Sequence, residues 1–257
     1  MSESACLITE REHKMSMKKI AHRGISAQAP ENTRAAFEKM IAMNADWLET
    51  DIDMTADGEL ILIHDDRVDR TSDGSGTVND ITLIDLQKLD FGRWFSEAYA
   101  NERIVTLKWL IDFINRYHFN VNFELKTALR YDKQNLYLAS VCQALRQVSS
   151  DVKIIVSSFD VNLLKKFHML MPDIKTGILM ASQLPDNIVT VARDIGAVYV
   201  HPDVEYLTKE QAKHLIANHL PVNVWTVNDT AVAEKLKKWQ VAAIFTDFPE
   251  VKTIEYT

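Results

Sequence analysis

Short apolar runs rich in valine and isoleucine alternate with amphipathic stretches from one end of the chain to the other. Runs typical of β-strands lie at 19–22, 47–54, 121–126, 153–157, 175–179, 197–201, 222–227 and 242–246. Helical patterns lie between them, for example at 33–43, 107–117, 133–148 and 208–218. Strands that alternate with helices form parallel sheets with right-handed crossovers. Eight such runs predict an α/β fold, a (β/α)8 TIM-type barrel. An open, doubly wound sheet is less favoured because no GxGxxG turn follows the first run.

The second run is followed by Asp57-Gly58 and by another strand-like run that ends at His64. Asp-Gly between alternating runs is a strong signal for a β-hairpin. If Asp57 and Gly58 form a two-residue loop, Asp51 lies opposite His64, and directly opposed residues share one face of the ribbon. We therefore expect Glu49, Asp51 and His64 to project together.

Residues 65–105 separate this hairpin from the next helical pattern. An ordinary βα loop has about 2–6 residues, so this segment is an insertion. Insertions at the carboxyl-terminal face of a barrel usually shape the substrate mouth. The chain has 257 residues, and one barrel typically has roughly 250. We expect a single barrel domain over 1–257, a small subdomain at 65–105 between the second barrel strand and its helix, and an N-terminal extension at 1–16.

The composition narrows the classes of function. Hydrophobic residues make up 47% of the chain, enough for a sizeable core, and the formal net charge is −7. No basic stripe is visible, so we expect no nucleic-acid partner. The sequence also has no polybasic segment and no apolar run of about 18 residues, so we expect no stable membrane anchor. Two cysteines, Cys6 and Cys142, cannot form a disulfide framework, which favours a cytoplasmic location.

Carboxylates on the predicted strands are the first candidates for chemistry. The run at 121–126 places Glu124 and Lys126 on one face, where a mutual ion pair would be a purely structural explanation. The hairpin adds Glu49 and Asp51 at the end of a neighbouring strand. Three converging carboxylates repel one another, and a divalent cation removes that conflict. All-oxygen ligands suit Mg²⁺ or Ca²⁺ better than Zn²⁺, so we expect one such cation.

Two histidines end strand-like runs, His22 in Ala-His-Arg-Gly and His64 in Ile-His-Asp-Asp. A free imidazole titrates near 6.5, so one ring can act as base while the other acts as acid. Arg23 offers a planar fork that suits a phosphate, or a structural salt bridge. His201 also ends a barrel strand but is given no role. The remaining histidines are interpreted as structural: His13, His118, His168, His214 and His219.

Motifs spread over residues 20–249 resemble the glycerophosphodiester phosphodiesterase family. The matching segments are AHRG (21–24), APENT (29–33), LETDIDMTADGELILIHD (48–65), DRTSDGSGTVNDITLIDLQKLDFGRWF (69–95), NFELK (122–126), SSFD (157–160), WTVND (225–229) and TDFP (246–249). Each motif is weak alone, but their order and the insertion make the set specific. Ile25 departs from the small residue common in the family, and it is expected to narrow the pocket.

The resemblance implies a role for each candidate. His22 and His64 form the acid–base pair, and Arg23 and Lys126 hold the phosphate. The implied metal ligands are Glu49, Asp51 and Glu124. The resemblance also implies that Phe159 and Trp225 line the pocket. Only the resemblance singles them out, because single aromatic residues usually belong to the core. Asn32 and Thr33, which the family shares, are also adequately explained as the N-cap of the first helix.

The expected reaction is metal-dependent hydrolysis of small glycerophosphodiesters to glycerol 3-phosphate and an alcohol. The sequence leaves open which histidine is the acid, whether water or the glycerol 2-hydroxyl attacks, and whether the chain is a monomer or a homodimer. One alternative is a phosphodiester lyase or a lysophospholipase D-like enzyme. Such an activity would release a cyclic phosphate or a lysophosphatidate. A glycosidase that uses Glu49 and Glu124 leaves both histidines without a role. An inactive glycerophosphoryl-binding barrel would be expected to have lost one of these polar residues.

Overall fold

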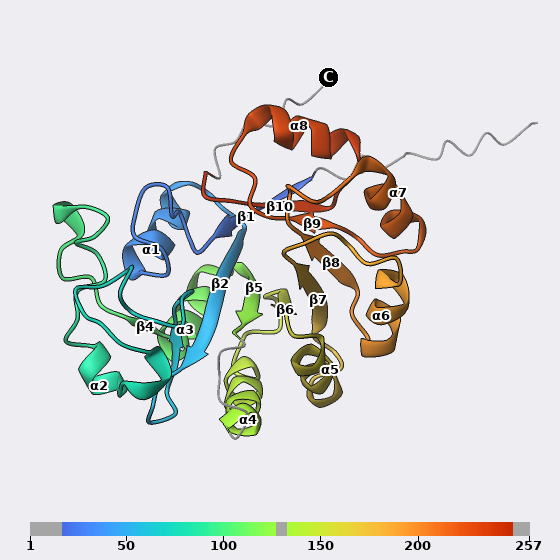
Figure 1. Cartoon of the computed structure of the whole chain (residues 1–257). Helices are drawn as coiled ribbons and strands as arrows, with labels where there is room; N and C mark the ends of the chain where they lie inside the picture. The colour runs from blue at the N-terminus through green and yellow to red at the C-terminus, as the bar shows by residue number, and fades with distance from the viewer. Residues whose placement is uncertain (1–16, 127–132, 249–257) are drawn as a thin grey trace, which may run out of the picture.

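The computed structural model describes residues 17–126 and 133–248. Eight parallel strands follow one another in the order β8-β7-β6-β5-β2-β1-β10-β9. Parallel bridges between Val200 and Val222 and between Asp203 and Trp225 connect the two ends of this series. The predicted TIM-type barrel is therefore confirmed, and Figure 1 shows its helices around the strands. The predicted extension at 1–16 lies outside the described residues. The barrel strands are β1 (Lys18–His22), β2 (Trp47–Met54), β5 (Asn120–Leu125), β6 (Ile154–Ser158), β7 (Lys175–Met180), β8 (Tyr199–Pro202), β9 (Asn223–Val224) and β10 (Ala243–Thr246).

The long helices cover the outside of the barrel, and most of them begin at a capping side chain. Thr33 caps α1 by accepting a hydrogen bond from the Ala36 amide, as the sequence predicted. Asn32 does not cap this helix, because its side chain turns to Asp51 instead. The helices are α1 (Arg34–Ala42), α3 (Leu107–Tyr117), α4 (Gln134–Leu145), α5 (Val161–Leu170), α6 (Ile188–Ile195), α7 (Lys209–Ala217) and α8 (Thr230–Lys238).

The hairpin differs from its prediction by one residue of register. Strand β3 (Leu60–Leu62) pairs with β2 so that Ile52 faces Leu62, and the Ile63 amide donates to the Asp51 carbonyl. Asp51 therefore lies opposite Ile63, and the predicted pairing of Asp51 with His64 is wrong. The Thr55 amide donates to the Glu59 carbonyl beyond the last strand pair, so residues 56–58 form a three-residue loop instead of a two-residue one, and Gly58 in this loop adopts φ 89°.

The segment at 65–105 packs beside the barrel over a small apolar cluster of its own. It contains η1 (Val78–Asp80), α2 (Leu83–Leu86) and η2 (Glu97–Tyr99), and it leads into β4 (Val105–Thr106). Strand β4, which the sequence did not predict, pairs antiparallel with β3 and so fixes the end of the insertion to the hairpin. The buried members of the cluster are Ile61, Ile63, Val68, Val78, Leu86, Phe91 and Ile104.

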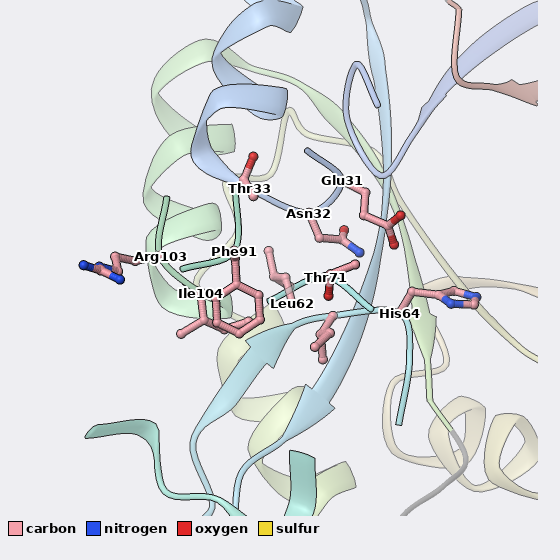
Figure 2. A pocket seen from close by; sticks show the side chains of 10 residues that line it. Glu31, Asn32, Thr33, Leu62, His64, Thr71, Phe91, Arg103 and Ile104 are labelled. Carbon is pink, nitrogen blue, oxygen red and sulfur yellow. The ribbon is translucent and has the colours of Figure 1, made fainter. Parts of the chain in front are cut away.

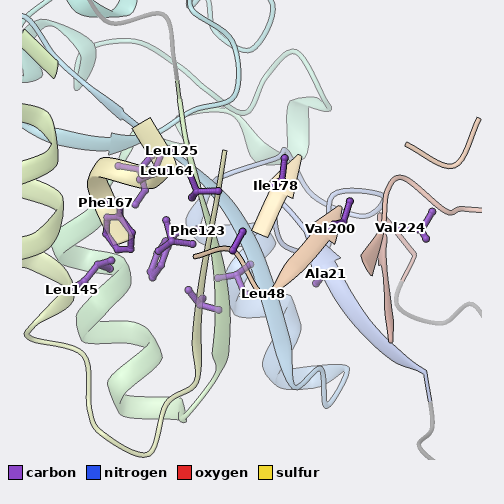
Figure 3. Close-up of a cluster of buried hydrophobic side chains, with 14 of the residues drawn as sticks. Ala21, Leu48, Phe123, Leu125, Leu145, Leu164, Phe167, Ile178, Val200 and Val224 are labelled. Carbon is purple, nitrogen blue, oxygen red and sulfur yellow. The ribbon is translucent and has the colours of Figure 1, made fainter. Parts of the chain in front are cut away.

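Successive side chains of each strand point to opposite faces of the barrel wall, and this separates two apolar layers. Side chains such as Leu48, Phe123 and Val200 belong to the main core, which includes helix residues such as Phe167 (Figure 3). Ile25 is fully buried in this core and does not line the cavity that contains His22 and His64, so the expectation that it narrows the pocket is wrong. A second cluster contains inward-facing residues of the barrel strands: Ile20, Trp47, Ile155, Ala243 and Phe245. Further inward positions towards the carboxyl-terminal ends of β2 and β5 carry the buried acidic side chains of Glu49, Asp51 and Glu124.

Candidate active site

Three carboxylates from two neighbouring strands converge inside the barrel. Asp51 on β2 is the register partner of Glu124 on β5, and Glu49 lies two residues earlier on β2. All three residues are buried. One oxygen from each carboxylate lies within 4.8 Å of the others. The structure therefore brings together the three side chains that the sequence singled out as metal ligands.

Burial and mutual repulsion change the acidity of these groups. Burial, followed by the charges of Asp51 and Glu124, raises the pKa of Glu49 well above its usual value. The same causes, burial and the charge of Asp51, raise the pKa of Glu124 to about 7. Burial also acts to raise the pKa of Asp51, but the charges of Arg23 and Lys126 hold it well below its usual range. A buried oxygen cluster with too few positive charges for its carboxylates fits a divalent cation of the Mg²⁺ or Ca²⁺ type.

Lys126 lies directly beside the carboxylate trio. Its Nζ is 2.8 Å from Glu124 Oε1 and 3.5 Å from Asp51 Oδ1. Burial acts to lower the pKa of Lys126, but the two carboxylates raise it overall. The ion pair with Glu124, first considered as a structural explanation, is therefore present. This ion pair is part of the carboxylate cluster, so it does not by itself explain why three carboxylates meet here.

Arg23 is held by contacts on both its main chain and its side chain. Its backbone amide donates to Glu49 Oε2 at 3.0 Å, and its Nη1 donates to Glu31 Oε1 at 2.9 Å. Its Nε lies 3.5 Å from Asp51 Oδ2 without a hydrogen bond, and no described residue accepts from this buried N–H. A buried donor without an acceptor beside a carboxylate cluster is suited to an incoming anion.

The turn after β1 fixes the main chain of Arg23. Arg23 has φ 57° and Gly24 has φ 83°, both in the left-handed region. A Cβ at position 24 would lie 2.8 Å from Ala36 Cβ and 2.9 Å from its carbonyl carbon, so only glycine fits against α1. This close approach explains why glycine follows the arginine in the AHRG motif.

Each candidate histidine is oriented by a carboxylate. His22 Nδ1 donates to Asp247 Oδ1 at 2.7 Å, and Ser26 Oγ donates to the same oxygen at 2.9 Å. His64 Nδ1 donates to the adjacent Asp65 Oδ1 at 2.7 Å. In both rings Nε2 is the nitrogen that stays available for chemistry, and both rings line one cavity. Burial lowers the pKa of His64, which favours the neutral ring.

Several supporting residues escaped the sequence analysis. Asn32 Nδ2 donates to Asp51 Oδ2 at 2.9 Å, and Thr50 Oγ1 donates to Asn32 Oδ1 at 2.7 Å. Asp65 adjoins His64 in the chain, which was an available signal. Asp247 lies 225 residues from His22, and no spacing pattern connects the two.

The cavity between these groups measures about 360 Å³, including its open mouth. Phe159 and Trp225 form one wall, with their ring centroids 5.8 Å apart and their planes at 90°. Asn122 and Ser157 are polar lining residues, and Asn122 Nδ2 donates to Ser157 Oγ at 2.8 Å. His201 is fully buried in the barrel and is not among the described residues that line this cavity. The described residues that line it are His22, Arg23, Glu49, His64, Asn122, Glu124, Ser157, Phe159, Leu179, Trp225 and Phe245.

The fold and this site define a TIM-barrel hydrolase. Residues 22–251 match the model of the glycerophosphoryl diester phosphodiesterase family, so the chain belongs to this family and the resemblance is confirmed. The chain is accordingly a glycerophosphodiester phosphodiesterase by family.

Individual relatives agree with this assignment. A putative glycerophosphodiester phosphodiesterase of Bacillus subtilis is 39% identical, over 90% of this chain and 94% of the relative. A glycerophosphodiester phosphodiesterase of Caldanaerobacter subterraneus is 35% identical over the same shares of the two chains. Among solved structures, a phosphodiesterase of Oleispira antarctica in complex with the product sn-glycerol-3-phosphate is 30% identical. It superposes with a TM-score of 0.86 and covers 90% of this chain and 93% of that one. Among the described residues, no helix has the length and apolarity of a membrane span.

Proposed function

We propose that the chain hydrolyses glycerophosphodiesters to glycerol 3-phosphate and an alcohol. The observation that carries the proposal is the meeting of two carboxylate-bound histidines, Arg23 and a buried carboxylate trio around one cavity. The glycerol 3-phosphate bound to the Oleispira antarctica relative supports the same product here.

The proposed cation, Mg²⁺ or Ca²⁺, would be held by Glu49, Asp51 and Glu124 and would supply Lewis-acid stabilisation of phosphoryl charge. Arg23 binds a phosphate oxygen through the side of its guanidinium that has no acceptor in the structure. Lys126, directly after β5, adds a second positive charge beside the carboxylate trio.

His22 and His64 exchange protons with the substrate through Nε2. One ring deprotonates the nucleophile, and the other protonates the departing alkoxide. Each carboxylate partner fixes the tautomer that leaves Nε2 without a proton, and it stabilises the imidazolium that forms when Nε2 takes one.

Two regions of the cavity suit the two ends of such a substrate. Asn122 and Ser157 offer hydrogen bonds to glycerol hydroxyls. Phe159 and Trp225 offer apolar contact to the methylene groups of the substrate. We further propose that the chain acts in the cytoplasm as a monomer or homodimer, in line with its cysteine content and net charge.

Phosphorus NMR of the products tests this proposal. The full chain is incubated with glycerophosphocholine and Mg²⁺ or Ca²⁺, with and without chelator. We expect glycerol 3-phosphate, released only with the cation. His22→Ala and His64→Ala should each lower kcat by about 10²–10⁴-fold. His118→Ala is the matched control, since this exposed histidine also binds an aspartate, Asp151. A cyclic phosphate as the final product would indicate the lyase, and full activity in the double histidine variant would contradict the scheme.

A further inference from the structure

Arg70, in the segment at 65–105, lies between two carboxylates that hold active-site residues. Its Nε donates to Asp65 Oδ2 at 2.6 Å and its Nη2 to Asp65 Oδ1 at 3.0 Å. On its other edge, Nη1 donates to Glu31 Oε2 at 2.8 Å and Nη2 to Glu31 Oε1 at 2.7 Å. One guanidinium therefore makes bidentate contact with both carboxylates, a geometry that lysine cannot reproduce.

Each of these carboxylates also holds a residue of the proposed catalytic site. Asp65 Oδ1 accepts from both Arg70 and His64, and Glu31 Oε1 accepts from both Arg70 and Arg23. A continuous chain of contacts thus runs from Arg23 through Glu31, Arg70 and Asp65 to His64. We propose that Arg70 is a positioning residue that sets the orientation of Arg23 and His64 without touching the substrate.

The location of these contacts supports the positioning role. Glu31 and His64 line a small cavity between the turn before α1 and the insertion (Figure 2). The Glu31 side chain is only 12% exposed and that of Asp65 is 27% exposed, so neither carboxylate is fully solvated. Without Arg70, the carboxylates of Glu31 and Asp65 would repel each other with no guanidinium between them. Asp65 would then no longer be held in place for its hydrogen bond with His64.

Arg70 differs from the ordinary ion pairs on the same segment. Arg67 makes a single hydrogen bond to Asp69 at 3.1 Å, and both side chains are exposed. A single exposed pair of this kind contributes little to stability or geometry. Arg70 makes four hydrogen bonds and also lies over the Trp94 ring, 6.0 Å from its centroid. Arg67 is therefore a matched control for a change at position 70.

The inference rests on the proposed function for the roles of Arg23 and His64, so the test combines a kinetic and a substrate-free measurement. Arg70→Gln should lower kcat/KM for glycerophosphocholine by roughly 10- to 100-fold, as expected for loss of a supporting contact. Arg70→Lys should recover part of that loss, and Arg67→Gln should match the wild type. The Arg70 variants should melt within about 4 °C of the wild type.

Nitrogen-15 NMR of histidine-labelled full-length protein, without substrate, reads the ring tautomers directly. In the wild type, His64 should carry its proton on Nδ1. Arg70→Gln should convert this ring to a mixture of tautomers and leave His22 unchanged, since Asp247 holds His22 independently. His64→Ala and His22→Ala assign the two signals.

The outcomes separate the two proposals. Unchanged His64 signals with a kcat/KM within about twofold of the wild type would overturn the positioning role. Signals of both histidines that shift together, with a large fall in melting temperature, would overturn it too, because the change would then be general. A wild type without activity on any glycerophosphodiester, in which His64 still responds to Arg70→Gln, would refute the proposed function and leave the positioning role standing.

Discussion

Cation binding to the carboxylate trio should release protons, because burial and mutual repulsion raise the pKa of Glu49 and of Glu124. Burial and the charge of Asp51 raise the pKa of Glu124 to about 7, and that of Glu49 is also raised well above its usual value. Glu124 is thus mainly protonated at pH 6, the raised pKa of Glu49 acts in the same direction, and a cation must displace protons to reach the oxygens. We therefore expect at least about one proton released for each ion bound at pH 6.

The sign follows from the direction of both shifts. Affinity should rise with pH, because the deprotonated form that binds the ion grows as pH passes through the raised pKa values. Below pH 7, the proton on Glu124 makes the dissociation constant about tenfold weaker for each unit of pH lost, and protonation of Glu49 acts in the same direction. Above about pH 8, Glu124 is already ionised, and its share of the dependence should disappear.

Isothermal titration calorimetry with Mg²⁺ or Ca²⁺ at pH 6, in buffers of different ionisation enthalpy, counts the protons. Glu124→Gln should weaken binding and lower the number of protons released by about one. Glu59→Gln, an exposed change on the hairpin loop, should leave both quantities unchanged. Affinity that is equal at pH 6 and pH 8, with no proton released, would refute this account of the trio.

Three further predictions concern the surroundings of the trio. Asp247→Asn should lower kcat/KM roughly 10²-fold in a steady-state assay, because an amide does not stabilise protonated His22; a near-normal rate would count against the pairing. Burial acts to raise the pKa of Asp247, but the hydrogen bond with His22 lowers it to about 2. The ionised carboxylate therefore contributes at most about 2 kcal/mol to the free energy of unfolding. This contribution is complete above pH 4 and disappears as pH falls towards 2. The free energy of unfolding, measured by urea denaturation, should fall less between pH 5 and pH 3 in Asp247→Asn than in the wild type. Equal falls in the two proteins would contradict this contribution. Trp225→Ala should raise KM roughly tenfold and Phe159→Ala less, since Phe159 is 41% exposed; an unchanged KM in both variants would remove them from the binding site.

The periodic features of the sequence predicted much of the fold. Alternation along each strand separated Glu49 and Asp51 from the outward-facing Leu48, and it placed Glu124 between Phe123 and Leu125. Because neighbouring parallel strands end at the same face, the carboxylates from β2 and β5 were expected to converge, as the structure has them.

The hairpin register could not be predicted in the same way. Asp57-Gly58 is compatible with a two-residue loop and with a three-residue loop that ends in a left-handed glycine. The choice depends on contacts such as the hydrogen bond that the Leu83 amide in the insertion donates to the Asp57 carboxylate. Such a contact joins distant segments and leaves no periodic signal.

The residues that orient the histidines and Arg23 were missed for a related reason. Asp247, Glu31 and Arg70 lie in turns and loops, where charged residues are common and usually solvated. Their partners are distant in sequence, since Glu31 and Arg70 are 39 residues apart. Only the folded chain shows that these charges meet.

Diffraction from crystals of the full chain soaked in Mn²⁺, with anomalous difference maps, tests the central claim most directly. Mn²⁺ accepts the same carboxylate ligands as Mg²⁺ and gives an anomalous signal. We predict one strong peak at about 2.0–2.6 Å from oxygens of Glu49, Asp51 and Glu124, which is lost in Glu124→Gln crystals. A peak bound elsewhere, or none at these three carboxylates at saturating Mn²⁺, would contradict the account.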